Sequence, residues 1–508
     1  MENILIGLQQ FLNPMVFLAL MAGTLLGLIV GALPGLNDSI TIAVLIPVTF
    51  GMDPHVALSL LVGIYCASAC GGSIPAVLLE IPGTASAMVT AWDGYPMTLK
   101  GKCKQALSLC MTSSFFGGIT SAMVLLFFAP ILAQWALKFG PPEYFMLAIL
   151  GMSTVIGMAG KNITKNFLSM GIGLWLACIG MSPTTGMARF TFGTVSLMDG
   201  IPLIPRMIGL FGVLSLLKMF DAVGRKKTDA AIASENAAHC TDDRIGLPDR
   251  AMCKRLLPTW LKSSFIGNVL GIIPGAGMTM AIFLAYDQAK KANPHLEFGT
   301  GVPEGVAAPE SANNAVVASS MVPLLSLGIP GNGTSALFLG ALTIQGMRTG
   351  PTLFNDYPDM AYMIIMGFVL ANLAMLPMSL MFCKHLASKV LKLNPQVLAA
   401  GVIMLCVTGS YAYMNNPFHI GVMVVFGVIG YLFWKFDIPQ APLILSTILG
   451  GMMESNWVSS MVYADHSPIV FVQRPISLVL LILSVLFLIW PLVQRLKKRI
   501  TTPKATMA

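Results

Sequence analysis

The sequence predicts an all-α membrane protein that crosses the bilayer many times. Of its 508 residues, 56% are hydrophobic and only 10% are charged, and the mean hydropathy is +0.78. Soluble domains carry about 25% charged residues. At about 20 apolar residues per helix, the chain accommodates about 11 or 12 spans. No large soluble domain fits beside them, which excludes a nucleic-acid-binding protein and a soluble enzyme.

The distribution of basic residues predicts which segments are cytoplasmic. The first apolar run lacks the basic start of a signal peptide, so we expect it to be retained as the first span. The first basic residue is Lys100, whereas nine lie between Lys218 and Lys262 and five between Arg495 and Lys504. Because cytoplasmic loops retain Lys and Arg, these two segments are expected inside and the N-terminus outside. The net charge of +8 therefore does not indicate a polyanion partner.

A polar stretch over 221–258 separates two hydrophobic halves that share Gly and Pro motifs in the same order. Four motif pairs match, namely Gly31-Ala-Leu-Pro-Gly with Gly271-Ile-Ile-Pro-Gly, Ile81-Pro-Gly with Ile329-Pro-Gly, Asn162 with Asn415, and Ile201-Pro with Ile438-Pro. We predict a first membrane repeat at 1–220, a cytoplasmic loop at 221–258, a second repeat at 259–460, and a final helix with a basic tail at 461–508. An odd number of spans in the first half would invert the second half, which is a transporter architecture.

Four Gly and Pro clusters interrupt the hydrophobic runs and should break their helices, because proline removes a backbone donor and glycine tolerates positive φ. Such backbone is tolerated at membrane depth where it lines a cavity. The restarted helix offers N–H groups to an anion, and freed carbonyls suit Na⁺. The alternative is a set of proline kinks filled by neighbouring helices. The predicted substrate-binding residues in and near these clusters are Pro34, Gly35, Asn37, Ser73, Pro82, Gly83, Thr84, Pro274, Gly275, Pro330, Gly331, Asn332, Gly333, Thr334 and Ser335.

Polar residues inside apolar runs mark further candidates. Asn313 and Asn314 lie in such a run, where unpaired carboxamides are costly, so we predict that they line the site. For cation coupling the candidates are Asp38, Glu80, Glu310 and Asn314. Alternatives stay open: Asp38 and Glu310 could cap helices, and Glu80 could pair with a basic residue or lie at the membrane interface. We expect no cofactor and no resident metal, with Na⁺ or H⁺ as the coupling ion and Na⁺ bound only transiently.

Three stretches carry a family resemblance: Phe50-Gly-Met-Asp-Pro through Asp93-Gly-Tyr-Pro, Glu304-Gly-Val-Ala-Ala-Pro-Glu-Ser-Ala-Asn-Asn, and Pro323-Leu-Leu-Ser-Leu-Gly-Ile-Pro-Gly-Asn-Gly-Thr-Ser. With them the chain resembles the large membrane subunit of the tripartite tricarboxylate transporter family, the TctA type. The resemblance implies a secondary carboxylate importer of the bacterial inner membrane, driven by a cation gradient. It also implies two protein partners, a small four-helix membrane subunit and a periplasmic substrate-binding protein.

The chain departs from the family at Asn37, Asp38 and Glu80, where the family usually has glycines and an asparagine. Two added carboxylates near an anion site oppose a highly charged ligand unless cations or protons compensate them. An ATP-driven pump is excluded, because neither Gly-Lys pair is followed by Ser or Thr as a phosphate-binding loop requires. The remaining alternatives are a transporter without a binding protein, a carboxylate channel, and an intramembrane serine enzyme.

Overall fold

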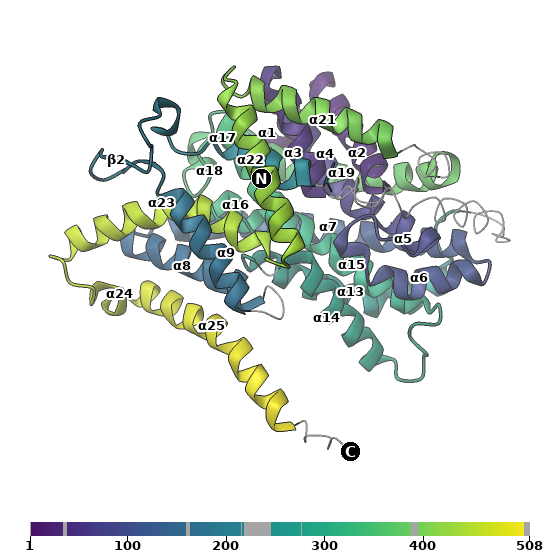
Figure 1. Ribbon diagram of the computed structural model, residues 1–508. Coiled ribbons are helices and arrows are strands. Elements are labelled where there is room, and N and C mark those ends of the chain that lie inside the picture. The colour runs from purple at the N-terminus through teal and green to yellow at the C-terminus, as the bar shows by residue number, and fades with distance from the viewer. Residues whose placement is uncertain are drawn as a thin grey trace, which may run out of the picture. The chain divides into compact units, whose positions relative to one another are not determined.

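The computed structural model describes residues 2–33, 38–158, 163–214, 216–217, 245–275, 277–387 and 395–501, and nearly all ordered elements within them are helices (Figure 1). This confirms the predicted all-α class. In the described chain, strands are limited to the short antiparallel pair β1 (Gly180–Met181) and β2 (Ala188–Arg189). Within the residues that the structure describes, five helical segments are long and apolar enough to cross a membrane, namely Pro14–Gly31, Pro54–Leu79, Cys103–Ala136, Pro358–His385 and Phe418–Lys435. The polar loop predicted at 221–258 lies largely outside the described residues.

The chain divides into two compact units. Unit 1 comprises Met1–Ala136, Leu203–Ile273 and Gly277–Tyr431. Its helices before the polar loop are α1 (Glu2–Gln10), α2 (Pro14–Gly31), α3 (Asp38–Leu45), η1 (Ile46–Gly51), α4 (Pro54–Gly71), α5 (Ser73–Leu79), η2 (Ala85–Ala87), α6 (Thr90–Leu99), α7 (Cys103–Ala136), α10 (Leu203–Met207) and η4 (Ile208–Val213). Its helices after the loop are α13 (Arg250–Ile272), α14 (Gly277–Ala292), α15 (Pro303–Ser319), α16 (Met321–Leu327), α17 (Gly333–Ile344), α18 (Leu353–Asp356), α19 (Pro358–His385), α21 (Pro395–Ala412) and most of α22 (Phe418–Lys435).

Unit 2 comprises Leu137–Pro202, Pro274–Ala276 and Leu432–Ala508. It contains α8 (Pro141–Met158), α9 (Ile163–Ala177), η3 (Val195–Leu197), α23 (Gln440–Tyr463), α24 (Val470–Gln473), α25 (Pro475–Thr501) and the strand pair. The start of α8 is tied to α25 by the buried Glu143, whose Oε1 accepts hydrogen bonds from Arg474 Nε at 2.6 Å and from Ser477 Oγ at 2.9 Å. Arg189 pairs with Glu454 through two contacts of 2.8 Å, which fixes the strand pair on α23.

The predicted internal repeat is visible in how the helices of unit 1 pack. Helix α2 packs on α4 through Gly27, where an added Cβ would lie 2.6 Å from the Ile64 carbonyl oxygen. Helix α13 packs on α15 through Gly267, where an added Cβ would lie 2.5 Å from the Ala312 carbonyl oxygen. These glycines hold the same place in the two halves, so each repeat contains a matching pair of helices in backbone contact. That the repeats are inverted in the membrane stays a prediction.

Each repeat also contains the same short helix and the same chain break after it. Helices α5 and α16 have seven residues each, with proline at the third position, and each is followed by a residue in the left-handed conformation. That residue is Gly328 (φ 74°) after α16 and Glu80 (φ 60°) after α5. The Ile-Pro-Gly motifs follow directly in both copies. The sequence therefore correctly predicted helix breaks at these two clusters.

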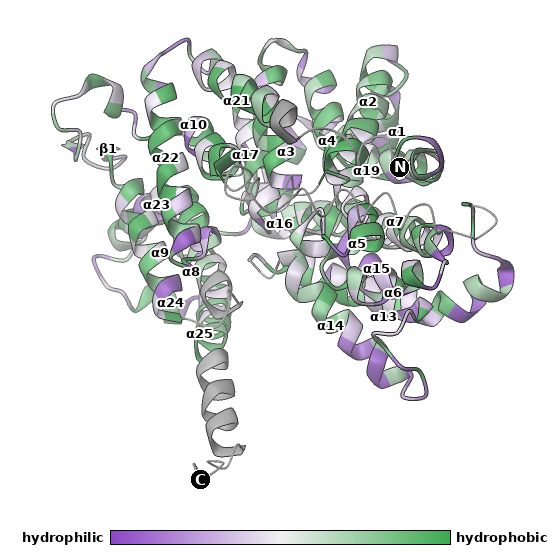
Figure 2. Ribbon diagram, turned by 45° about the vertical axis from the view of Figure 1, so that its right-hand side comes forward, coloured by the Kyte–Doolittle hydropathy of each residue, from purple (hydrophilic) through white to green (hydrophobic). Residues whose placement is uncertain are grey.

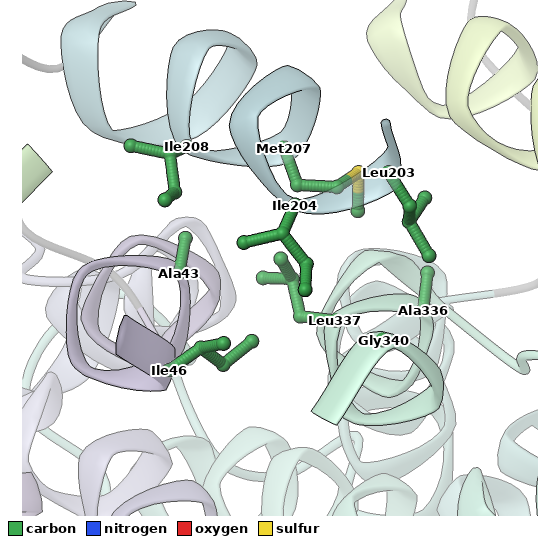
Figure 3. Close-up of a pocket in the computed structure, with 9 residues that line it drawn as sticks. All are labelled: Ala43, Ile46, Leu203, Ile204, Met207, Ile208, Ala336, Leu337 and Gly340. Carbon is green, nitrogen blue, oxygen red and sulfur yellow. The ribbon is translucent and has the colours of Figure 1, made fainter. Parts of the chain in front are cut away.

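An apolar contact fixes α3 and α17, the two helices whose N-termini form the candidate site described below. Leu203, Ile204, Met207 and Ile208 of the α10–η4 segment face Ala43 and Ile46 on one side and Ala336, Leu337 and Gly340 on the other (Figure 3). Burying these side chains stabilises the contact by about 25 cal/mol per Å² of apolar surface.

Figure 2 shows hydrophobic residues along most helices and hydrophilic ones gathered at the end of α14 and the loop after it.

Candidate functional site

The N-termini of α3 and α17 meet in unit 1 through a hydrogen-bonded carboxylate. Asp38 opens α3 and is buried, and its Oδ2 accepts a hydrogen bond of 2.5 Å from the Thr334 hydroxyl. Ser39 Oγ lies 2.7 Å from Thr334 Oγ1. Because the Thr334 proton is committed to Asp38, the Ser39 hydroxyl is the donor in this second contact. Asp38, Ser39 and Thr334 thus form one polar cluster, although Thr334 lies 296 positions after Asp38 and 295 positions after Ser39.

Asn332 is fixed beside this cluster by two sets of hydrogen bonds. It forms a capping box with Ser335, in which each side chain accepts a 2.8 Å bond from the other residue's backbone N–H. Its amide nitrogen donates to the Tyr65 hydroxyl at 2.9 Å. The Ser320 hydroxyl donates to its own helix at Val317, so Tyr65 donates to Ser320. These hydrogen bonds orient the Asn332 amide. The sequence predicted Asn332 as a site residue but did not predict the contribution of Tyr65.

Asp38, Ser39, Asn332 and Thr334 line a cavity of about 140 Å³. The lining residues come from the segments that follow all four predicted breaks, and they are Asp38, Ser39, Ala85, Ser86, Met278, Thr279, Asn332, Gly333 and Thr334. Among these described residues Asp38 is the only carboxylate, and none is Lys or Arg. Five of the others carry a hydroxyl or amide oxygen. The cavity therefore offers a hard-oxygen environment with one negative charge.

The cavity is nearly symmetric with respect to the two repeats. Asp38 and Ser39 follow the first Pro-Gly motif as Met278 and Thr279 follow its match, and Ser86 corresponds in the same way to Thr334. The repeat offset from Asp38 could therefore have identified Thr279, which sequence reasoning missed. The symmetry is broken in charge at one position, because Asp38 stands where the second repeat has the uncharged Met278.

The structure brings together only some of the predicted site residues. Asp38, Asn332, Gly333 and Thr334 line the cavity, and Ser335 caps α17 beside it. Thr84 contacts the lining residue Ser86 at 3.0 Å. Several other predicted residues make contacts near the breaks. The Gly83 N–H donates to the Gly72 carbonyl, and the Ser73 hydroxyl donates to the Cys70 carbonyl. Gly331 packs on Ser320, and Pro82 and Pro330 directly precede Gly83 and Gly331. Pro34, Gly35 and Asn37 lie outside the described residues.

Other predicted residues are not among those that line the cavity. Pro274 and Gly275 belong to unit 2, where the Thr154 hydroxyl donates to the Pro274 carbonyl. Asn313 is buried in α15, and its amide donates to the Ala69 carbonyl at 3.1 Å. Asn314 lies 3.5 Å from Glu310 on the same helix. The capping alternative for Glu310 does not apply, since this residue lies inside α15 rather than at its start.

Glu80 is exposed on unit 1 and is not among the residues that line the cavity. Its left-handed backbone costs a residue with a Cβ about 1 to 2 kcal/mol, whereas its repeat counterpart is glycine. Its assignment to cation coupling stays a prediction.

Replacing Glu80 by Gly should therefore raise the thermal stability of the purified protein, by about 1 kcal/mol, because glycine adopts this conformation without strain. Glu80→Gln is the matched control, since it removes the charge but keeps a Cβ on the residue that must adopt the left-handed conformation. Melting in detergent measures both variants. A Gly variant that melts below the Gln variant would show that the backbone at this position is not strained.

Comparison with known proteins identifies the chain. The model of the tripartite tricarboxylate transporter TctA family matches residues 17–445, a range that contains the cavity and most of both predicted repeats. The chain belongs to this family. As a TctA-family protein it is a multi-pass membrane protein of a transporter family, rather than a member of an enzyme family.

Two relatives of this TctA-family chain come from Agrobacterium vitis. An uncharacterized 52.8 kDa protein in the TAR-I ttuC′ 3′ region is 35% identical over 494 residues, covering 94% of both chains. An uncharacterized protein in the TAR-II ttuC′ 3′ region is 34% identical over 234 residues, covering 46% of this chain and 96% of the relative. No solved structure matches the chain.

Proposed function

We propose that this protein is the large membrane subunit of a secondary active carboxylate importer in the bacterial inner membrane, driven by a gradient of Na⁺ or H⁺. It receives its substrate from a periplasmic binding protein and works with a small four-helix membrane subunit. Membership of the TctA family supports this assignment. The observation that carries it is the cavity at the ends of the four chain breaks, with Asp38 as its single carboxylate.

The chemistry of the cavity suits a cation and an anion together. The Asp38 carboxylate and the hydroxyls of Ser39 and Thr334 are oxygen ligands of the kind that Na⁺ prefers at unwound helices. The N-terminus of α17, at Gly333 and Thr334, favours a carboxylate through the helix dipole. Without a cation, the charge of Asp38 opposes that anion. Cation binding and carboxylate binding therefore support one another, which is the condition for coupled transport.

Alternating access follows from the repeat. The cavity is lined by equivalent segments of both repeats, so an exchange of conformation between them exposes it to one side of the membrane and then to the other. A channel differs from this in that it does not accumulate its substrate. A transporter without a binding protein differs in that purified membrane subunits suffice for uptake.

Uptake of labelled mono-, di- and tricarboxylates into proteoliposomes tests the proposal, with Na⁺ and pH gradients varied separately and the binding protein added or omitted. We expect accumulation above equilibrium that collapses when the gradients are dissipated. Uptake that equilibrates and ignores both gradients would identify a channel. The absence of uptake and exchange for every carboxylate tested would overturn the proposal.

A further inference from the structure

We propose that Glu310 is a proton-exchange site of the transport cycle, separate from the residues that line the cavity. The inference rests on the proposed import function and adds to it a coupled proton. The observation behind it is that the Glu310 carboxyl is fully buried and is held only by side-chain donors that tolerate both of its protonation states.

A comparison of the buried carboxylates sets Glu310 apart. In the described part of the chain five acidic residues are buried, namely Asp38, Asp93, Glu143, Glu304 and Glu310. Glu143 pairs with Arg474, and Glu304 with Arg255. Asp93 accepts three backbone N–H groups, and Asp38 lines the cavity. A buried carboxylate without such a partner is costly, and it avoids the cost by taking up a proton.

Glu310 has no basic partner and no backbone donor among the described residues. Its Oε1 accepts a hydrogen bond of 2.7 Å from Ser114 on α7, and its Oε2 accepts one of 2.9 Å from Thr90 on α6. The Asn314 amide nitrogen lies 3.5 Å from Oε1. Hydroxyl groups both donate and accept. When the carboxyl is protonated, one hydroxyl can turn its own proton away and accept the new O–H, so both charge states are satisfied.

The distances favour a proton over a metal ion at this position. Both hydroxyl contacts have ordinary hydrogen-bond length, which a proton satisfies without moving any heavy atom. A Na⁺ ion would have to enter between the carboxyl and its donors. In each cycle an O–H bond forms at a Glu310 oxygen with a proton from water on one side of the membrane. The same bond breaks as that proton returns to water on the other side.

The titratable neighbours of Glu310 leave it as the group that exchanges the proton. Cys70 on α4 and Cys110 on α7 are buried thiols on two of the helices packed against α15. Elements α16 and η2 carry no titratable side chain. Cys66 on α4 is a third buried thiol. On the other elements packed against α15, the remaining ionisable groups are engaged with other partners or lie at least partly exposed. They are His55 and Tyr65 on α4; Asp93, Tyr95 and Lys100 at α6; Cys103 and Lys104 on α7; Arg250, Cys253, Lys254, Arg255 and Lys262 on α13; and Tyr286, Asp287, Lys290 and Lys291 on α14.

The position of Glu310 also connects the two repeats. It lies on α15 of the second repeat, whereas Ser114 and Thr90 lie on α7 and α6 of the first. A change in the charge of Glu310 therefore changes a contact between repeats, which is where alternating access requires movement. This links proton uptake to the conformational change without direct contact between the proton and the substrate.

The experiment compares two reactions of the purified transporter in proteoliposomes. An internal pH dye measures proton flux driven by a carboxylate gradient, and labelled carboxylate measures exchange with equal solutions on both sides. We expect Glu310→Gln to reduce carboxylate-driven proton flux at least about tenfold while exchange stays within about twofold of wild type. Exchange by this variant should also lose its pH dependence, which a merely structural role would not produce.

Ser114→Ala is the second variant, because it keeps the carboxyl and removes one donor. It should retain proton flux, with the pH dependence of that flux shifted by about half a pH unit or more. If the Gln variant does not fold, this shift tests whether Glu310 exchanges the proton. Proton flux at the wild-type level in Glu310→Gln, an unshifted profile in Ser114→Ala, or carboxylate uptake by wild type without proton flux would each overturn the inference. Wild type that moves no carboxylate at all would instead overturn the proposed function.

Discussion

Replacing Asp38 by Asn should abolish gradient-driven accumulation of the carboxylate and lower the initial uptake rate at least about tenfold. Asparagine has nearly the size of aspartate and can still accept the hydrogen bond from Thr334, so the fold of the α3 and α17 ends should persist. What is lost is the single negative charge of the cavity. A tenfold loss corresponds to about 1.4 kcal/mol, which is modest for removing a charged ligand of a cation.

The measurement is uptake into proteoliposomes under an inward Na⁺ or H⁺ gradient. Asp356→Asn is the matched control, since it makes the same substitution at an exposed residue of α18 that does not line the cavity. The control should transport at the wild-type rate. If Asp38→Asn accumulates substrate with the same cation dependence as wild type, Asp38 only caps its helix and the cation site must lie elsewhere.

Replacing Asp93 by Ala should destabilise the protein by about 3 kcal/mol or more. The carboxylate is fully buried in α6 and accepts hydrogen bonds of 2.8 to 2.9 Å from the N–H groups of Gly299, Gly301 and Val302. Its other oxygen accepts a bond of 2.8 Å from the Tyr286 hydroxyl. Hydrogen bonds to charged groups contribute about 1.5 to 3 kcal/mol each, and stranded donors add a desolvation cost. The substitution therefore releases the loop that leads into α15.

This effect is measured by heating the protein in detergent and determining, by size-exclusion chromatography, how much of it remains monodisperse at each temperature. Tyr286→Phe is the graded control, because it removes one of the four hydrogen bonds to the carboxylate and should cost about 1.5 kcal/mol. Gly305→Ala should resemble Asp93→Ala, since an added Cβ would lie 2.0 Å from Asp93 Oδ2. Equal melting of Asp93→Ala and wild type would mean that the loop holds its conformation without this carboxylate.

The helix breaks were predictable from sequence because their cause is local. Proline and glycine act on their own backbone, and the matched Ile-Pro-Gly motifs predicted the two ends at Glu80 and Gly328. The candidate cavity was predictable in part, through Asp38, Asn332 and Thr334. Tyr65 was not, because its role depends on contacts with residues 255 and 267 positions away that no local pattern encodes. The exposure of Glu80 was equally beyond a hydropathy pattern, which does not say which residues at the end of a short helix are exposed.

The one difference in charge between the repeats at the cavity, Asp38 in the first and Met278 in the second, has a thermodynamic consequence. If two identical halves exchanged conformations, the outward-open and inward-open forms of the empty protein would be mirror states of equal free energy. A charge carried by one half removes that degeneracy. Because only a difference in free energy sets the population of two states, we expect the unloaded protein to rest mostly in one of them, chosen by how well that state hydrates Asp38. Asp38, which we propose as the cation ligand, would then also determine whether the empty transporter is mostly outward-open or mostly inward-open.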